Sequence, residues 1–544
     1  MAQYFQLGTF MPLKTMLLAA AGLAALCATA PSTAQNTAAI IDEGMNRSQV
    51  MLTASQLMDG IGGRMTNSPS LRRAENWAVA KMQGYGLANV HREGFDFGRG
   101  WELIDASATM ITPRRLKMTT IPVAWTPPTA GTVRASIIVA PMNKVEHFAE
   151  WRGKVAGKIV LVSLPGESEE PKEAAFQRLS DAEIGKLDHF EQPKFDPESI
   201  AQRRKRMAFS RQLDAFLKSE GAVAWVRKSY RDNGLVTGEG SGFGIGETLT
   251  LPGFELAAED YRRLTRLAKT GAAPEIELVS NVRFDDSDSQ AHNLFGEIPG
   301  SDPKAGFVMA GGHFDSWIAS DGASDNGAGS VVVLEAARIL RTLGVRPKRT
   351  IRFALWEGEE QGLLGSRAWL EEHMVHRAVP AGLSVREAGF AWSLAYPITP
   401  RPGFGALKAY FNMDNGSGKL RGIYAEQNSG AETLLKSWLA SFASLDADKV
   451  VASKTGGTDH VYMQAVGLPA YQFIQDPLDY DSRVHHSNLD TLDHMRADDL
   501  RQASVVLAGV LLAAANSDKE LPRPPLPSQP TVTDPFAYPD PDKR

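Results

Sequence analysis

Cysteine is nearly absent from this sequence of 544 residues, which contains only Cys27. That residue lies in an apolar segment near the N-terminus, so the rest of the chain can form neither disulfide bonds nor thiolate metal sites. A lipid-attachment motif would need a small residue before the cysteine, whereas Leu26 stands there. The chain beyond this segment therefore requires neither an oxidising nor a reducing compartment.

A large excess of charge is also missing, since the net charge is only −5. This balance gives no electrostatic reason to expect a nucleic-acid partner. Apolar residues make up 43% and charged residues 22% of the chain, which is typical of a soluble globular protein. At this length the chain has room for more than one domain, or for one domain with a large insertion.

The one sustained apolar run, residues 16–30, is too short for a comfortable transmembrane helix. Lys14 precedes it and the small residues Ser32, Thr33 and Ala34 follow it, an arrangement typical of a cleaved export signal. An uncleaved anchor is the alternative interpretation. We expect residues 1–34 to be removed, and the mature protein to be periplasmic or extracellular without a stable membrane anchor.

Three sequence patterns follow one another along the chain. A helical pattern precedes residue 90, with Asn67, Ser68 or Ser70 as its N-cap and Gly84 or Gly86 at its end. After Trp101 come short β-like runs at residues 135–141, 157–166 and 221–229, with a polar helix-like stretch at 178–220. From about residue 291, strand-like runs alternate with helical ones, and the strand-like runs are residues 306–312, 350–356, 407–414 and 469–475. This alternation predicts an α/β fold with a parallel sheet.

Acids and histidines follow the ends of these strands, where open α/β sheets place their sites. They are His313, Asp315, Asp325, Glu359, Glu360, Asp414, His485 and His486. Imidazole and carboxylate without thiolate suit zinc, with manganese and cobalt as alternatives. Singly, an Asp beside Gly is usually a turn, and paired glutamates often begin a helix. Their recurrence after successive strands favours a metal site assembled by the fold.

In order and spacing, the motifs HFDSW, GASDNGAG, WEGEEQGLLGS, NMDN and HHSNLDT resemble those of the co-catalytic di-zinc exopeptidases of the aminopeptidase and carboxypeptidase Q type. The segments that begin IGGRMTNSPS and GKVAGKIVLV resemble, respectively, the N-terminal region of the carboxypeptidase Q branch and a protease-associated insert. The resemblance implies a three-layer α/β/α sandwich with a mostly parallel central sheet, plus the β-rich insert. It divides the chain into a signal (1–34), an N-terminal part of the peptidase domain (35–105), the insert (106–285), the catalytic domain (286–518) and a proline-rich tail (519–544).

The resemblance also implies roles for the clustered residues. One zinc would be held by His313 and Asp414, the other by Glu360 and His486, and Asp325 would bridge them. The His-Ser-x-x-Asp pattern selects His486 over His485. Two residues would serve the chemistry without binding metal, Asp315 by orienting His313 and Glu359 as the general base. The oxyanion partner stays open between Tyr480 and His485.

The expected activity is hydrolysis of dipeptides or short peptides by a water shared between two metal ions, as an aminopeptidase or a carboxypeptidase Q-like dipeptidase. One alternative is a single-zinc acyl transferase similar to glutaminyl cyclases. Another is a catalytically inactive receptor or binding domain on the same fold. The number of metal ions bound per chain separates the peptidase, which needs two, from the single-zinc acyl transferase. The sequence allows a homodimer without indicating one, and it does not define the preferred substrate side chain.

Overall fold

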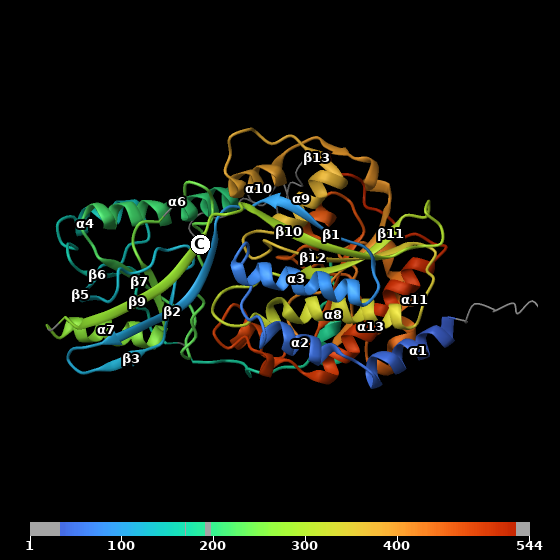
Figure 1. Cartoon of the computed structure of the whole chain (residues 1–544), viewed down its shortest axis with the longest axis horizontal. Helices are drawn as coiled ribbons and strands as arrows, with labels where there is room; N and C mark the ends of the chain where they lie inside the picture. The colour runs from blue at the N-terminus through green and yellow to red at the C-terminus, as the bar shows by residue number, and fades with distance from the viewer. Residues whose placement is uncertain (1–32, 169, 191–196, 248, 272, 529–544) are drawn as a thin grey trace, which may run out of the picture.

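The computed structural model describes residues 33–168, 170–190, 197–247, 249–271 and 273–528. Nearly all of the expected signal segment and the end of the proline-rich tail lie outside these residues. Within them, no helix combines the length and the apolar character needed to cross a membrane. Figure 1 shows two bodies side by side, one built around a sheet with helices on both faces and one richer in strands.

The main sheet has eight strands, and its centre is parallel. Strands β12, β11, β15 and β18 run parallel, while the pairs β1–β10, β10–β12 and β16–β18 are antiparallel. The sheet is therefore mixed, with the expected parallel order confined to its middle and to the β16–β17 pair. The strands in spatial order are β1 (Ala88–Asp96), β10 (Gln290–Ile298), β12 (Thr350–Trp356), β11 (Phe307–His313), β15 (Leu407–Asn412), β18 (Ala470–Gln475), β16 (Leu420–Tyr424) and β17 (Lys449–Val451).

Helices cover both faces of this sheet because its central strands are apolar on both sides. In β11, Val308 and Ala310 pack into one core while Phe307 and Met309 pack into the other. The first core is covered by α1 (Thr33–Asn46), α2 (Val50–Met58), α3 (Pro69–Gly84), α8 (Ala328–Thr342), α11 (Glu432–Leu439) and α13 (Ala497–Asn516). The second is covered by α9 (Leu364–His373), α10 (Val385–Leu394) and α12 (His460–Ala465), with the small pair β13 (Val375–Arg377) and β14 (Ile398–Pro400) beside them.

The second sheet, also of eight strands, lies in a body that we call the β-rich lobe (residues 100–285). Its first strand begins at Gly100, so it extends across the expected domain boundary at residue 106. Its strands in spatial order are β3 (Leu116–Met118), β2 (Gly100–Met110), β9 (Glu275–Asp285), β5 (Val133–Val139), β6 (Ile159–Leu161), β7 (Ala224–Lys228), β8 (Gly253–Leu256) and β4 (Thr120–Pro122). Helices α4 (Phe148–Trp151) and α6 (Pro197–Ser219) pack on one face and α7 (Ala258–Lys269) on the other.

Local signals in the sequence account for the element ends nearest the site. Ser68 is the N-cap of α3, where its hydroxyl accepts a hydrogen bond from the backbone N–H of Leu71 at 3.1 Å. Pro69 occupies the first turn, where a missing N–H costs nothing. One of the expected caps is thereby confirmed. The helix-like stretch at 178–220 forms two separate helices, the short α5 (Asp181–Lys186) and α6.

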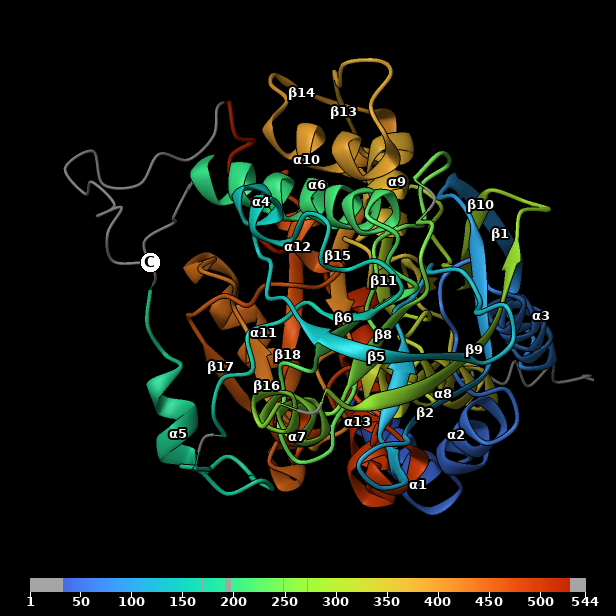
Figure 2. The same ribbon diagram turned by 90° about the vertical axis from the view of Figure 1, so that its left-hand side faces the viewer.

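Helix α5 lies apart from the rest of the β-rich lobe. Figure 2 shows it beside β17, at the edge of the main sheet. The neighbouring backbone of Gln177 exchanges hydrogen bonds of 2.7 and 2.8 Å with Leu478 of the main body. The chain between β6 and α6 therefore binds the two bodies together.

Candidate metal centre

The strand ends of the main sheet bring the expected side chains together. His313 is the last residue of β11. Glu359 and Glu360 follow the end of β12, and Asp414 follows the end of β15. Asp325 lies in the turn before α8. Because β12, β11 and β15 are parallel neighbours, their carboxyl ends share one edge of the sheet.

His313 forms one half of the cluster. Its Nε2 lies 3.2 Å from Oδ1 of Asp325 and 3.4 Å from Oδ1 of Asp414. These three side chains are at most 5% exposed, and their donor atoms all lie within 4.8 Å of one another. This is a set of donors that a single metal ion can bind.

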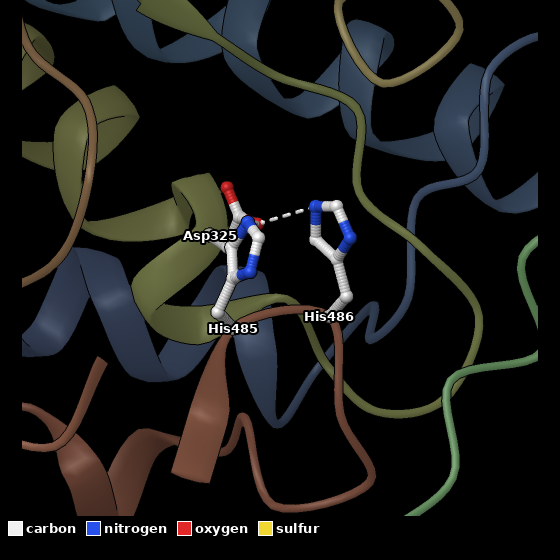
Figure 3. Close-up of side chains that lie close together, drawn as sticks. All are labelled: Asp325, His485 and His486. Atoms are coloured by element: carbon white, nitrogen blue, oxygen red, sulfur yellow. Dashed lines mark ion pairs between the residues drawn. The ribbon is translucent and has the colours of Figure 1, made fainter. Parts of the chain in front are cut away.

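His486 forms the other half. Its Nε2 lies 3.0 Å from Oε2 of Glu360 and 3.1 Å from Oδ2 of Asp325. Asp325 therefore turns one carboxylate oxygen toward His313 and the other toward His486. This is the geometry of a carboxylate that bridges two positions. Figure 3 shows the His486 ring directed at Asp325.

The two consecutive histidines differ in their distance from the cluster. Their rings stack with centroids 3.8 Å apart, and Nε2 of His485 is 3.7 Å from Oδ2 of Asp325. Burial lowers the pKa of His485. The contacts of His486 with Asp325 and Glu360 are shorter than the contact of His485, and this favours His486 as the ligand. The His485 ring lies beside the cluster, with its centroid 4.9 Å from that of the Tyr480 ring.

Asp315 links the histidine to the glutamate loop. Its carboxylate accepts hydrogen bonds of 3.3 Å from the backbone N–H groups of Glu359 and Glu360, and one of 2.8 Å from Oγ1 of Thr66. The Nδ1 atom of His313 lies 3.0 Å from the backbone oxygen of Asp315, closer than the 3.7 Å to its carboxylate. Asp315 thus holds the imidazole through its carbonyl and the glutamate loop through its side chain.

Glu359 lies beside the cluster without being its closest carboxylate. Its Oε2 atom is 3.9 Å from Nε2 of His313, and the residue is 9% exposed. Burial raises the pKa of Glu359 well above its ordinary value, and the charges of Asp414, Glu360 and Asp459 raise it further against the opposing effect of His313. A carboxyl group at this distance can take up a proton from the centre without leaving its place.

The charge balance of the cluster fits a cation. Burial raises the pKa of Glu360 to about 7, with a further contribution from Asp325, although His486 opposes it. Oε1 of Glu360 is buried and has no hydrogen-bond partner among the described residues. Crowded, buried carboxylates with an unpaired oxygen are stabilised by a nearby metal ion. The nitrogen and oxygen donors without thiolate fit zinc.

Several residues that support the cluster were not expected from the sequence. The carboxylate of Asp490 accepts hydrogen bonds from the backbone N–H of Ser324 at 2.6 Å and of Asp325 at 3.0 Å. Arg64, fully buried, donates to the backbone oxygens of Phe314 and Gly322 at 2.8 and 2.9 Å. Glu239, from the β-rich lobe, lies 2.8 Å from Nδ1 of His486. Arg64 and Asp490 lie in segments that carry the family resemblance, whereas no motif points to Glu239.

A cavity of about 370 Å³ opens onto the cluster. Besides the clustered acids and histidines, its lining includes Tyr480, Arg386, Phe390 and Tyr462. Arg386 and Phe390 belong to α10, which therefore covers one side of the approach. Burial in the first place raises the pKa of Tyr480 well above its ordinary value, so its hydroxyl stays protonated and can donate a hydrogen bond.

Comparisons with known proteins show which proteins the chain is similar to. Residues 293–511 match the model of Peptidase family M28. Carboxypeptidase Q of Rattus norvegicus is 26% identical over 490 residues, which is 89% of each chain. Carboxypeptidase Q of Homo sapiens is 26% identical over 493 residues, again 89% of each. Both relatives align with the β-rich lobe as well as with the sheet that carries the cluster.

Solved structures share the fold. The M28 peptidase precursor of Shewanella amazonensis superposes with a TM-score of 0.63 at 22% identity, covering 91% of this chain and 99% of that one. The zinc aminopeptidase of Bacillus subtilis superposes with a TM-score of 0.54 at 19% identity, covering 86% and 95%.

Fold, cluster and family match together define a metallopeptidase, a hydrolase that acts on peptides. The segment that contains the cluster, residues 293–511, matches Peptidase family M28, and the similarity to carboxypeptidase Q supports a co-catalytic zinc exopeptidase family.

Proposed function

We propose that the protein hydrolyses dipeptides or short peptides with a free N-terminus, using two zinc ions held by His313, Asp325, Glu360, Asp414 and His486. The observation that carries this proposal is the position of Asp325, whose two carboxylate oxygens lie 3.2 and 3.1 Å from the imidazoles of His313 and His486. Manganese or cobalt fit the same donors.

In this mechanism the bound metal ions would lower the pKa of a shared water and polarise the peptide carbonyl. Glu359 would accept a proton from the water as its oxygen bonds to the peptide carbonyl carbon, and would give that proton to the departing amine when the C–N bond breaks. Asp315 keeps the backbone of Glu359 in place, so the base stays within reach of the centre. Tyr480 or His485, both in the wall of the cavity, stabilises the negative charge on the carbonyl oxygen.

The cavity supports a small substrate. A volume of about 370 Å³ is near the lower end of the range of ligand pockets, roughly 300–1,000 Å³. The similarity of this chain to carboxypeptidase Q supports a peptidase that acts on short peptides. We extend the proposal to the lobe: residues 106–285 serve as a protease-associated insert that shapes access to the centre.

Three groups of substrates test this proposal on the purified, zinc-loaded protein: aminoacyl chromogens, dipeptides, and dipeptides with a blocked N-terminus. We expect hydrolysis of free dipeptides, little of blocked ones, loss of activity on chelation and its return with zinc. Cyclisation of N-terminal glutamine by a protein that binds one zinc would instead support the acyl transferase. Binding of peptides without turnover would support a receptor.

We also propose that the protein is exported and that its signal is removed near Ala34. Sequencing of the N-terminus of the protein made by its native host tests this. A chain that begins at Met1 or Met11 in the cytoplasm would contradict it.

A further inference from the structure

The β-rich lobe contributes a side chain to the metal centre. Glu239 follows a backbone stretch of the lobe that runs alongside the loop of His485 and His486. Its Oε1 atom lies 2.8 Å from Nδ1 of His486, on the ring edge opposite Nε2. That Nε2 is the atom directed at Glu360 and Asp325. A single imidazole therefore joins a carboxylate of one body to two carboxylates of the other.

The contact is supported by a series of hydrogen bonds between the two loops. The backbone N–H of Val236 donates to Oδ1 of Asn488 at 3.0 Å, and the N–H of Asn488 donates to the carbonyl of Val236 at 3.1 Å. Arg231 donates to the carbonyl of His485 at 2.7 Å and also to that of Asp481. The loop from 231 to 239 thus holds the histidine loop from both ends.

The backbone of His486 needs such support. Its φ is +58°, in the left-handed region that residues other than glycine rarely adopt. Conformations of this kind persist where surrounding contacts fix them. The contacts that fix this one include the lobe residues Arg231, Val236 and Glu239, in addition to residues of the main body.

From these contacts we infer that Glu239 is a positioning residue for the metal ion that Glu360 and His486 would hold, here called the second metal ion. Glu239 accepts the Nδ1–H of His486 and so directs the Nε2 lone pair into the centre. The inference rests on the proposed function and deepens it. A histidine with a free choice of tautomer presents a lone pair at Nε2 only part of the time, whereas a carboxylate at Nδ1 fixes that tautomer and the ring orientation. The lobe is then part of the metal centre in addition to shaping its entrance.

The test is metal binding, measured without reference to activity. Metal-free protein is equilibrated with zinc buffered by a competing chelator, and the bound zinc is counted across a range of free zinc concentrations. We expect Glu239→Ala to bind the first zinc as the wild type does and the second with an affinity roughly 10–100-fold lower. Glu239→Gln should recover most of that loss, because the amide oxygen still accepts the Nδ1–H.

Two controls accompany these variants. Glu146→Ala removes an exposed carboxylate from the same lobe and should leave both affinities unchanged. Cobalt titration gives a second readout, since the absorption of the second cobalt ion should change in Glu239→Ala and not in Glu146→Ala. Circular dichroism of the metal-free variants shows whether they fold. Should Glu239→Ala not fold, Glu239→Met keeps the length of the side chain without an acceptor and takes its place.

The outcomes separate the inference from the proposed function. A wild-type protein that binds fewer than two zinc ions contradicts the proposed function. A wild type with two zinc ions, together with an unchanged second affinity in Glu239→Ala or Glu239→Met, overturns the role of Glu239 alone. Failure of Glu239→Gln to recover the affinity also overturns it, because hydrogen-bond acceptance is then not what the residue supplies.

Discussion

At the scale of single residues, the adjacent glutamates of WEGEEQG have different surroundings. Oε2 of Glu360 lies 3.0 Å from Nε2 of His486, whereas Oε2 of Glu359 lies 3.9 Å from Nε2 of His313. A carboxylate whose lone pairs are bound to metal is a poor base. The proposed roles of metal ligand and general base therefore require two different residues. The Asp315 carboxylate accepts hydrogen bonds from both backbone N–H groups and so holds the backbone of the pair in place.

Exchange of each glutamate for glutamine tests this division. Glu359→Gln should keep both metal ions and substrate binding but lose turnover by roughly 10²–10⁴-fold, the usual contribution of a general base. Glu360→Gln should weaken metal binding, and excess zinc should partly restore its activity. Zinc content and kcat measured side by side check both. Reversed phenotypes, with metal lost from Glu359→Gln and kept by Glu360→Gln, would contradict the assignment.

The acids and histidines of the centre could be predicted because each follows a strand or precedes a helix in a recognisable motif. His486 over His485 also followed from a pattern, and the shorter contacts of its Nε2 agree with that choice. Glu239 could not be predicted, since a single glutamate in a loop resembles any solvated acid until the fold brings it to His486. The carbonyl contact of Asp315 was equally hidden, because backbone atoms leave no signal in sequence.

At the scale of elements, the segment from Gln177 to α5 fastens the β-rich lobe to the main body. Arg178 contacts the carboxylates of Asp476 at 2.9 Å and Asp499 at 2.8 Å. Asp476 is fully buried, and it also accepts from Arg421 and from the backbone N–H of Leu179. Removal of the Arg178 guanidinium takes a charged partner from Asp499 and from one oxygen of Asp476, whose other oxygen keeps its contact with Arg421.

We expect Arg178→Ala to lower the free energy of unfolding by roughly 1.5–3 kcal/mol, the range for hydrogen bonds to charged groups. Arg134→Ala is the matched control, because its partner Glu275 at 2.7 Å is 34% exposed. Exposed pairs of that kind contribute roughly 0–1 kcal/mol. Urea titration of the three proteins measures the difference. Equal decreases in the free energy of unfolding of the two variants would show that the contacts of Arg178 do not stabilise the attachment of the lobe.

The sequence predicts the elements better than their pairing. The strand runs at 306–312, 350–356, 407–414 and 469–475 correspond to β11, β12, β15 and β18. Their apolar residues on both faces predict burial between helix layers. The antiparallel edges could not be predicted, because β1 and β16 take their direction from distant partners and a strand's own residues do not encode it.

At the scale of the whole molecule, we expect metal binding to be coupled to stability. The cluster places Asp325, Glu359, Glu360 and Asp414 around two imidazoles, all largely buried. Metal ions that bind the folded chain and not the unfolded one stabilise it, by about 4.1 kcal/mol per site when the free metal is 1,000 times Kd. Chelation should therefore lower the thermal midpoint, and zinc should restore it.

Differential scanning fluorimetry with and without chelator checks this expectation. Asp325→Ala supplies the comparison, since it removes the bridging carboxylate and should be nearly insensitive to the chelator. A wild-type midpoint that does not change on complete removal of metal would contradict the coupling.

We propose that the Asp325 carboxylate joins two metal ions in a single centre, and anomalous scattering from crystals of the zinc-loaded protein is the sharpest test of this arrangement. Data collected on both sides of the zinc absorption edge locate every bound zinc. We expect two peaks about 3.5–4 Å apart, one beside His313 and Asp414, the other beside His486 and Glu360, with Asp325 between them. A single peak, or two peaks that Asp325 does not join, would contradict it.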